Sequence, residues 1–172
     1  MIRPIVYYGD PVLRQRCEEI LTIDAEVLAL AEDLCDTVRS AKGAGLAAPQ
    51  IGIPRRLFVV CYGQDDPHGR PTLLDQPEVW INPQITPLSQ EGGVEEEGCL
   101  SIPGLLRDVE RPDRVQIVGK DIEGGERQEE AWGWRARVMM HENDHLNGKL
   151  FIDRLSKKER RGVQRHLNNL AR

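Results

Sequence analysis

The spacing of apolar residues predicts a helix in the first quarter of the chain. Within residues 24–42, apolar side chains recur every three or four positions, so a helix there would bury one face. These positions are Val27, Leu28, Leu30, Ala31, Leu34, Cys35 and Val38. Asp24 is suited to cap the start of this helix, and Gly43 is suited to follow its end.

Two further helices are predicted in the last quarter. A helical pattern begins near residue 133, carries two histidines and ends at Gly148. Ser156 is suited to cap a final helix over residues 157–172, which is amphipathic and locally basic.

Runs of β-forming residues predict strands between the first and second helices. The predicted strands are residues 56–62, 79–85, 114–122 and 126–132. Pro83 indicates an edge or a bulge in the second strand, and Gly124-Gly125 indicates a turn that joins the last two strands in a hairpin. Residues 63–77 are rich in proline and glycine and are predicted to be a surface loop. The run Glu95-Glu96-Glu97 is interpreted as mostly a solvated loop, with Glu97 able to pair with an arginine such as Arg111.

These elements predict an α+β fold. Antiparallel strands would surround a central helix that carries the histidines, with one helix on the N-terminal side and one at the C-terminus. A chain of 172 residues is long enough for one domain with a sizeable core, so residues 1–172 are expected to form a single domain.

Composition excludes several functional classes. The net charge of −5 gives no reason to expect DNA or other nucleic acid as the main ligand. No apolar run approaches the roughly 18 residues that span a bilayer, and the first residues do not resemble a signal or transit peptide. A cytoplasmic protein without a membrane partner is expected. The four cysteines are far apart, without a C-x-x-C pair, and are interpreted as reduced thiols.

The stretch "HENDHLNG" (141–148) carries the clearest chemical signal. In a helix, His141 and His145 lie on one face about one turn apart, and Glu142 lies beside them. This pattern is typical of a metal site in which the glutamate acts as general base. The structural alternative is two unrelated helix histidines with a solvated glutamate. Asp144 is equally suited to orient a ligand or a nearby cation and to be a solvated helix residue.

A catalytic metal site needs a third protein ligand. Glu159 and His166 lie downstream, both in the polar final helix, and His68 lies in the predicted loop. Cys99 lies upstream, between Gly98 and Leu100 and directly after the acidic run. A Cys/His/His set would leave one coordination position for water, yet Cys99 is equally suited to be a buried strand cysteine.

A third stretch, "GAGLAAPQIG" (43–52), is rich in small residues. Its first and third residues and Ala48 formally match a dinucleotide-binding pattern, but the stretch follows a helix and runs into Pro49, so that interpretation fails. The glycines allow close backbone approach, and the carboxamide of Gln50 is suited to donate to an oxyanion. The alternative is a turn followed by a polar strand end.

Taken together, "GAGLAAPQ", "EGCLS" and "HENDHLNG" resemble, in order and spacing, the three signature motifs of the peptide deformylases. The resemblance covers nearly the whole chain and includes "GDPVLR", "INPQI", "SIPG" and "GKLFIDRLS". It implies a metal-dependent hydrolase that removes the N-formyl group from the initiator methionine of nascent polypeptides and releases formate. The N-formylmethionyl nascent peptide is then the expected partner.

The resemblance also implies roles for individual residues. The implied metal ligands are Cys99, His141 and His145. The implied cofactor is one divalent metal ion, with Fe2+ expected in the cell and Zn2+, Ni2+ or Co2+ also able to occupy the site. Glu142 would be the general acid/base, and Gln50 and the backbone N–H of Leu100 would stabilise the oxyanion. Gly45 and Gly98 would contact the main chain of the peptide.

Two residues depart from the family pattern. Met140 occupies the position before the first histidine, where the family usually has glutamine, so a polar contact near the site is expected to be missing. Ala44 is smaller than the apolar residues common at its position, which would widen the methionine pocket.

Two other functions compete with deformylation. An ordinary H-E-x-x-H zinc peptidase would need a supported ligand downstream, and its activity would survive Cys99→Ala. A non-catalytic, deformylase-like binding protein is the other alternative. The basic final helix is suited to a transient contact with the ribosome, although a solvated helix packed on the domain explains its pattern at least as well.

Overall fold

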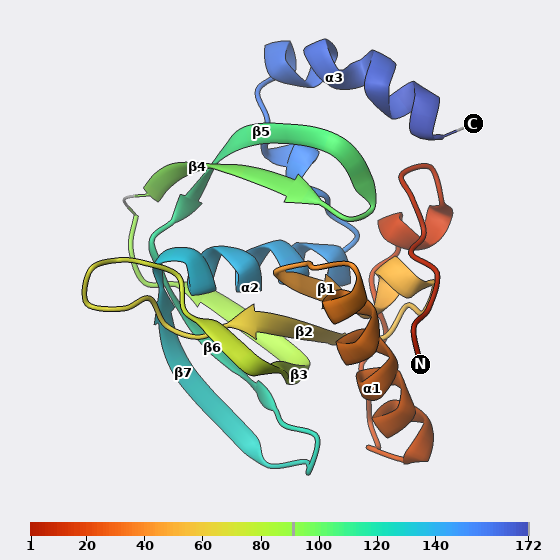
Figure 1. The fold of residues 1–172 in the computed structure, drawn as a ribbon, viewed down its shortest axis with the longest axis vertical. Helices are drawn as coiled ribbons and strands as arrows, with labels where there is room; N and C mark the ends of the chain where they lie inside the picture. The colour runs from red at the N-terminus through yellow and green to blue at the C-terminus, as the bar shows by residue number, and fades with distance from the viewer. Residues whose placement is uncertain (91, 172) are drawn as a thin grey trace.

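The computed structural model describes residues 1–90 and 92–171 (Figure 1). The helical segments are η1 (Pro11–Arg14), α1 (Ala25–Ser40), η2 (Ala48–Ile51), α2 (Gly133–Leu146), η3 (Phe151–Arg154) and α3 (Lys157–Leu170). The strands are β1 (Gly45–Ala47), β2 (Leu57–Tyr62), β3 (Leu73–Pro87), β4 (Gly92–Cys99), β5 (Ile102–Pro112), β6 (Arg114–Lys120) and β7 (Glu126–Trp132). The predicted α+β class is confirmed.

Two antiparallel sheets enclose α2. One sheet has five strands in the order β1-β2-β3-β6-β7, and the other is the β4–β5 hairpin. The helix α2 runs between the hairpin and the five-stranded sheet, so nearly all of its residues are buried (Figure 1).

Three apolar clusters hold these layers together. In the first, Ala136, Met139 and Met140 of α2 pack with Phe58 and Trp80 of the five-stranded sheet. The second cluster packs α1 against β1 and β2. The third joins β5, η3 and α3 to the N-terminal segment. Because α2 is packed closely on the five-stranded sheet, its apolar side chains have little freedom to change position.

Local capping signals set several helix boundaries. As predicted, the side chain of Asp24 accepts a hydrogen bond from the Val27 N–H at 3.0 Å, and Ser156 caps α3. Gly43 was predicted to follow the end of α1 directly, but the residue after the C-cap Ala41 is Lys42, which takes a left-handed conformation (φ 53°). Gly43 follows Lys42 and donates its N–H to the Val38 carbonyl, which completes a Schellman motif at the end of α1.

The strand predictions were correct for β2, β6 and β7 but not for the segments between them. The predicted loop over residues 63–77 is too long, because β3 already begins at Leu73 and continues its pairing with β2. The register of β3 shifts between Ile81 and Gln84, which confirms the bulge predicted at Pro83. The acidic run at 95–97 is not a loop but part of β4, where it pairs with β5.

None of the helices in the described part of the chain combines the length and the apolar composition needed to cross a membrane. The cysteines are not joined in disulfides: Cys17 and Cys61 are buried, and Cys35 and Cys99 are half-buried.

Candidate metal centre and active site

Two elements bring the three predicted metal ligands together. Cys99 ends β4, while His141 and His145 project from consecutive turns of α2, with ring centroids 5.2 Å apart. One potential ligand atom from each residue lies within 4.8 Å of the other two, and the Cys99 Sγ is 3.4 Å from the His145 Nε2. A thiolate and two imidazoles at this separation fit one divalent metal ion of the zinc or ferrous type.

The other ligand candidates lie elsewhere. Glu159 accepts the N–H of Ser156 at the start of α3, and the Nε2 of His166 is 2.8 Å from the Pro103 carbonyl. The backbone N–H of His68 donates to Asp66 in the loop after β2. None of the three belongs to the cluster formed by Cys99 and the two α2 histidines. The geometry therefore gives no support to the ordinary zinc-peptidase arrangement.

Glu97 orients one of the imidazoles. Its Oε1 lies 2.9 Å from the Nδ1 of His141, so an Nδ1–H donated to this carboxylate leaves Nε2 unprotonated and available to a metal. The buried Nδ1 of His145 has no hydrogen-bond partner among the described residues. The two histidines are therefore held differently: the Glu97 carboxylate orients His141, whereas packing orients the Nδ1 side of His145.

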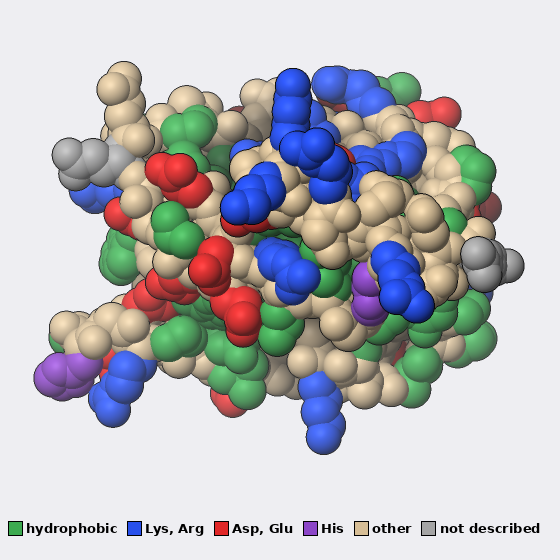
Figure 2. Space-filling model, turned by 90° about the horizontal axis from the view of Figure 1, so that it is seen from above, with side chains coloured by type: hydrophobic (Ala, Val, Ile, Leu, Met, Phe, Trp, Pro, Cys, Tyr) green, Lys and Arg blue, Asp and Glu red, His purple; other side chains and the backbone are tan. Residues whose placement is uncertain are grey.

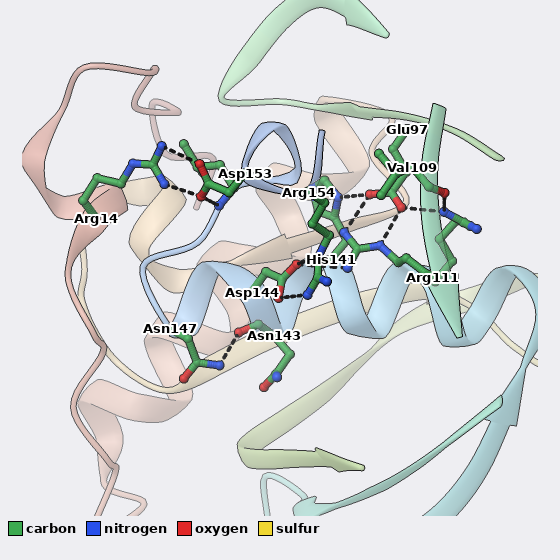
Figure 3. A network of polar contacts seen from close by, with 12 residues as sticks. Arg14, Glu97, Val109, Arg111, His141, Asn143, Asp144, Asn147, Asp153 and Arg154 are labelled. Atoms are coloured by element: carbon green, nitrogen blue, oxygen red, sulfur yellow. Dashed lines mark hydrogen bonds and ion pairs between the residues drawn. The ribbon is translucent and has the colours of Figure 1, made fainter. Parts of the chain in front are cut away.

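A buried ionic network surrounds Glu97 (Figure 3). Arg111 donates to its carboxylate from Nε at 2.6 Å and from Nη2 at 2.8 Å, and Arg137 donates from Nη1 at 2.7 Å. Arg111 also donates to Asp144 at 2.9 Å, which Arg154 contacts from the other side. The predicted pair of Glu97 and Arg111 is confirmed, and Asp144 binds nearby cations instead of a histidine.

The charge state of Glu97 follows from this network. Burial disfavours its carboxylate, but the hydrogen bonds from Arg111 and His141 outweigh burial and hold the pKa of Glu97 well below its usual range. Glu97 is therefore an anion at neutral pH, in position to accept the Nδ1–H of His141.

Glu142 differs from Glu97 in having no cationic partner. Its Oε2 is buried and has no hydrogen-bond partner in the described part of the chain, and burial raises the pKa of Glu142 to about 7. A cation on the neighbouring ligands would lower this pKa again. A carboxyl in this range is suited to accept a proton and to return it.

Gly45 leaves space for the Glu142 carboxylate. A Cβ at residue 45 would lie 2.8 Å from both the Cγ and the Oε1 of Glu142, closer than nonbonded atoms approach. Gly43 is similarly restricted, because its Cβ would lie 2.8 Å from the Leu100 side chain. The glycines of the 43–52 stretch therefore permit close packing against the other two motifs.

Gln50 connects the first motif to the second. Its Oε1 accepts the Ala47 N–H at 2.9 Å, which directs its Nε2 toward the Cys99 Sγ at 3.6 Å and the Ser101 Oγ at 3.2 Å. Leu100 follows Cys99 in the turn between β4 and β5. The Gln50 amide thus lies beside the candidate metal ligands, where an oxyanion donor would be needed.

A cavity of about 580 Å³ opens onto these groups. Its wall includes Gly45, Gly98 and Glu142 near the ligands. Ala44, Trp134 and Val138 contribute apolar surface, and so do Leu105 and Leu106 of β5. At Gly98 a Cβ would lie 2.7 Å from the Leu106 side chain, so this wall is also closely packed. The cavity suits a small apolar side chain attached to a polar backbone.

A family model described as polypeptide deformylase matches residues 2–161. The chain belongs to the polypeptide deformylase family. A peptide deformylase from Rhizobium meliloti (strain 1021) is 44% identical over 171 residues, which cover 99% of this chain and 95% of that protein. The structure of a peptide deformylase from Thermus thermophilus has a TM-score of 0.85 and 39% identity, and the match covers 99% of this chain and 98% of that one. An Ehrlichia chaffeensis peptide deformylase in complex with actinonin has a TM-score of 0.87 and 34% identity, with 98% and 95% covered.

Membership of the deformylase family makes the chain a metal-dependent hydrolase of the N-formyl group of peptides. The structure places both residues that were expected to depart from the family pattern. Met140 is buried in the apolar core cluster that also contains Trp80. Ala44 lines the cavity, as expected from its place in the first motif.

Sequence reasoning missed two residues near this deformylase site. Arg137 lines the cavity one turn before His141 and donates to Glu97. Asp65, in the loop after β2, accepts the N–H of Trp134 at 3.0 Å and so caps the start of α2. A signal for Arg137 was present, because a charged residue four positions before a ligand lies on the same buried helix face. No local signal marks Asp65, whose partner is 69 residues away.

Proposed function

We propose that this chain, as a single catalytic domain over residues 1–172, removes the N-formyl group from the initiator methionine of nascent polypeptides and releases formate. One observation carries the proposal: the Glu142 carboxylate, whose buried Oε2 has no hydrogen-bond partner among the described residues, lies in a cavity wall beside the cluster of Cys99, His141 and His145. A base, a metal site and a pocket for an apolar side chain are what hydrolysis of a formylated methionine requires.

Cys99, His141 and His145 would hold one divalent metal ion. Fe2+ is the metal we propose for the cell, and Zn2+, Ni2+ or Co2+ also suits a donor set of one thiolate and two imidazoles. When bound, the metal supplies a Lewis acid that lowers the pKa of water and polarises the formyl oxygen.

The residues around the ligands would carry out proton transfer and stabilise the developing negative charge. Glu142 takes a proton from the attacking water as the water oxygen bonds to the formyl carbon. The Gln50 Nε2 and the backbone N–H of Leu100 donate to the oxygen on which negative charge develops. The C–N bond then breaks, Glu142 returns its proton to the departing amine, and formate is released.

Peptide binding would use the free edges of two strands. β1 is an edge strand of its sheet, and β4 pairs only with β5 among the described strands, so both offer backbone groups to an extended peptide. Gly45 and Gly98 belong to these strands and line the cavity. We propose that their main-chain groups contact the backbone of the substrate.

The crowding around Glu142 favours a formyl group over an acetyl group. A formyl carbon carries only hydrogen, whereas an acetyl carbon carries a methyl that would need further space beside Gly45, Leu100 and Glu142, which together line the cavity. Acetyl-Met-Ala-Ser should therefore be cleaved much more slowly than its formyl counterpart. Comparable rates for the two peptides would contradict this account of the specificity.

Nascent chains are available at the ribosome, so we place the activity in the cytoplasm and propose a transient ribosome contact through α3. Lys and Arg side chains gather on the face of the molecule viewed in Figure 2. The exposed basic residues of α3 are Lys157, Lys158, Arg161 and Arg165. Reversing the charge of these four residues should abolish co-sedimentation with ribosomes; unchanged sedimentation would reject the contact. Deleting α3 is a poor test, because Val163 and Leu167 are buried in the third core cluster.

The activity is tested by formate release from formyl-Met-Ala-Ser with anaerobically purified, iron-loaded protein. Glu142→Ala should abolish release while metal remains bound, and Glu110→Ala, at an exposed position of β5, should leave it unchanged. Cys99→Ala should also abolish release, whereas an ordinary zinc peptidase would retain activity. A wild-type protein with stoichiometric metal, an intact fold and no formate release would instead support the non-catalytic alternative.

A further inference from the structure

The position of Cys99 relative to the two histidines depends on how the β4–β5 hairpin is held. The histidines belong to α2, which packs on the five-stranded sheet, whereas Cys99 ends β4. In the part of the chain that the structure describes, neither strand of the hairpin pairs with the five-stranded sheet. Apart from its chain connections and the hydrogen bond from the Tyr8 N–H to the Ser101 carbonyl in its turn, the hairpin is attached through side chains.

Arg137 of α2 contacts both strands of the hairpin. Its Nη1 donates to the Val109 carbonyl of β5 at 2.8 Å and to the Glu97 carboxylate of β4 at 2.7 Å. Its Nη2 donates to the Gly93 carbonyl of β4 at 2.8 Å. Only 7% of the Arg137 side chain is exposed, so these bonds form in a largely dehydrated environment.

A second connection lies on the other side of His141. Arg111 of β5 donates to Asp144 of α2 at 2.9 Å, three residues after His141, whereas Arg137 lies four residues before it (Figure 3). The two arginines share the Glu97 carboxylate, which also accepts from the His141 Nδ1. The helical turn that carries this histidine is thus tied to the hairpin at both ends.

We propose that Arg137 is a positioning residue that sets the distance between Cys99 and the α2 histidines by fastening the hairpin to the helix. The inference rests on the proposed function, because it assumes that these three residues bind the metal. Arginine suits the task because its planar guanidinium presents several donors in a fixed geometry. A lysine could reach one of the three acceptors but could not hold all of them.

The test compares Arg137→Met with Arg135→Met. Arg135 lies two residues earlier on α2, is also buried, at 3% exposure, and makes a similar set of bonds: to Glu129, Glu78 and the Tyr62 carbonyl. These partners belong to the five-stranded sheet and not to the hairpin. Both variants lose a buried guanidinium from the same helix, but only one loses the connection to Cys99.

Metal binding gives the readout. Cobalt-loaded protein reports the ligand geometry through its thiolate-to-metal and d–d absorption bands, and competition with a chelator measures the dissociation constant for Co2+. Arg137→Met should shift these bands and weaken Co2+ binding about 10- to 100-fold, as other losses of support around metal ligands do. Arg135→Met should keep the wild-type spectrum and change the affinity less than about threefold, even if it lowers the unfolding temperature. Arg137→Lys should give an intermediate affinity.

A wild-type cobalt spectrum and affinity in Arg137→Met would overturn the proposal. Equal losses of Co2+ affinity in the two methionine variants would overturn it as well, because the effect would then reflect general destabilisation. If Arg137→Met does not fold, Arg137→Lys carries the comparison with Arg135→Met. Formate release by the wild-type protein is measured separately: its absence would reject the proposed function, while the cobalt spectra would still decide the role of Arg137.

Discussion

Glu97→Gln replaces one carboxylate oxygen of a buried glutamate by an NH2 group. The side chain is 3% exposed and accepts from Arg111 twice, from Arg137 and from His141. A glutamine has one acceptor oxygen, and its NH2 group would face N–H donors on the other side. The variant therefore loses hydrogen bonds, leaves the Arg137 guanidinium without its buried anion, and leaves Arg111 with Asp144 as its anionic partner.

The loss of folding stability expected for Glu97→Gln follows from the burial of the ion pair. Removing one partner of a buried ion pair costs about 3–5 kcal/mol, because the remaining charge stays in a medium of low polarity. For a protein of this length, each kcal/mol shifts the unfolding midpoint by about 2–4 °C, so Glu97→Gln should unfold about 6–20 °C lower than the wild type.

Glu130→Gln is the matched control. Glu130 forms a 2.7 Å ion pair with Arg114, but these side chains are 48% and 56% exposed, so water replaces the lost interaction. An exposed pair of this kind contributes no more than about 1 kcal/mol. Thermal and urea unfolding of the three proteins, all measured with excess chelator so that bound metal does not contribute, would compare the two substitutions. Equal losses of stability in the two variants would refute the reasoning from burial.

Three further predictions concern the site and its supports. Gly45→Ala should lower formate release about 10- to 100-fold by displacing the Glu142 carboxylate, with metal content unchanged; full activity would show that this carboxylate tolerates displacement. Asp65→Ala should reduce the free energy of unfolding by about 0.5–2 kcal/mol through loss of the bond to the Trp134 N–H, and chemical denaturation at wild-type values would contradict this. Zn2+ at a hundred times its dissociation constant should stabilise the wild type by about 2.7 kcal/mol, whereas Cys99→Ala should show a much smaller shift at the same Zn2+ concentration, and an equal shift would argue against a thiolate ligand.

The elements predicted correctly are those whose signals are local. The boundaries of α1 and α3 depend on caps within the same turn, and Asp24 and Ser156 could be recognised from their neighbours alone. β6 and β7 are joined by a tight turn at Gly124-Gly125, so pattern and turn chemistry were sufficient for them. The end of α1 was misassigned by one residue, because Lys42 adopts the left-handed conformation that glycine usually takes.

The wrong predictions concern segments stabilised by distant partners. The acidic run ending in Glu97 has the composition of a solvated loop. Pairing with β5 makes it a strand in which Glu95 and Glu96 are exposed, while Glu97 is buried against Arg111 and Arg137. The first part of β3 lies in a segment rich in proline and glycine that predicts a loop, yet the pairing of Leu73 with Tyr62 keeps it extended. Composition cannot reveal such partners, because they are not neighbours in the chain.

In the candidate site, too, one part follows from local sequence and another part depends on residues that are distant in the chain. Helix geometry alone brings His141 and His145 together with Glu142 beside them, so the sequence by itself determined this part of the site. The residues did not decide between Cys99 and the downstream candidates; only the resemblance to a family favoured the cysteine. Its Sγ lies 3.4 Å from an imidazole 46 residues away because the β4–β5 hairpin is tied to α2 by buried ion pairs. The contact between Cys99 and His145 is therefore a property of the tertiary structure. The local sequence pattern of α2 and that of the β4–β5 hairpin each predict one element, but neither pattern determines the distance between the two.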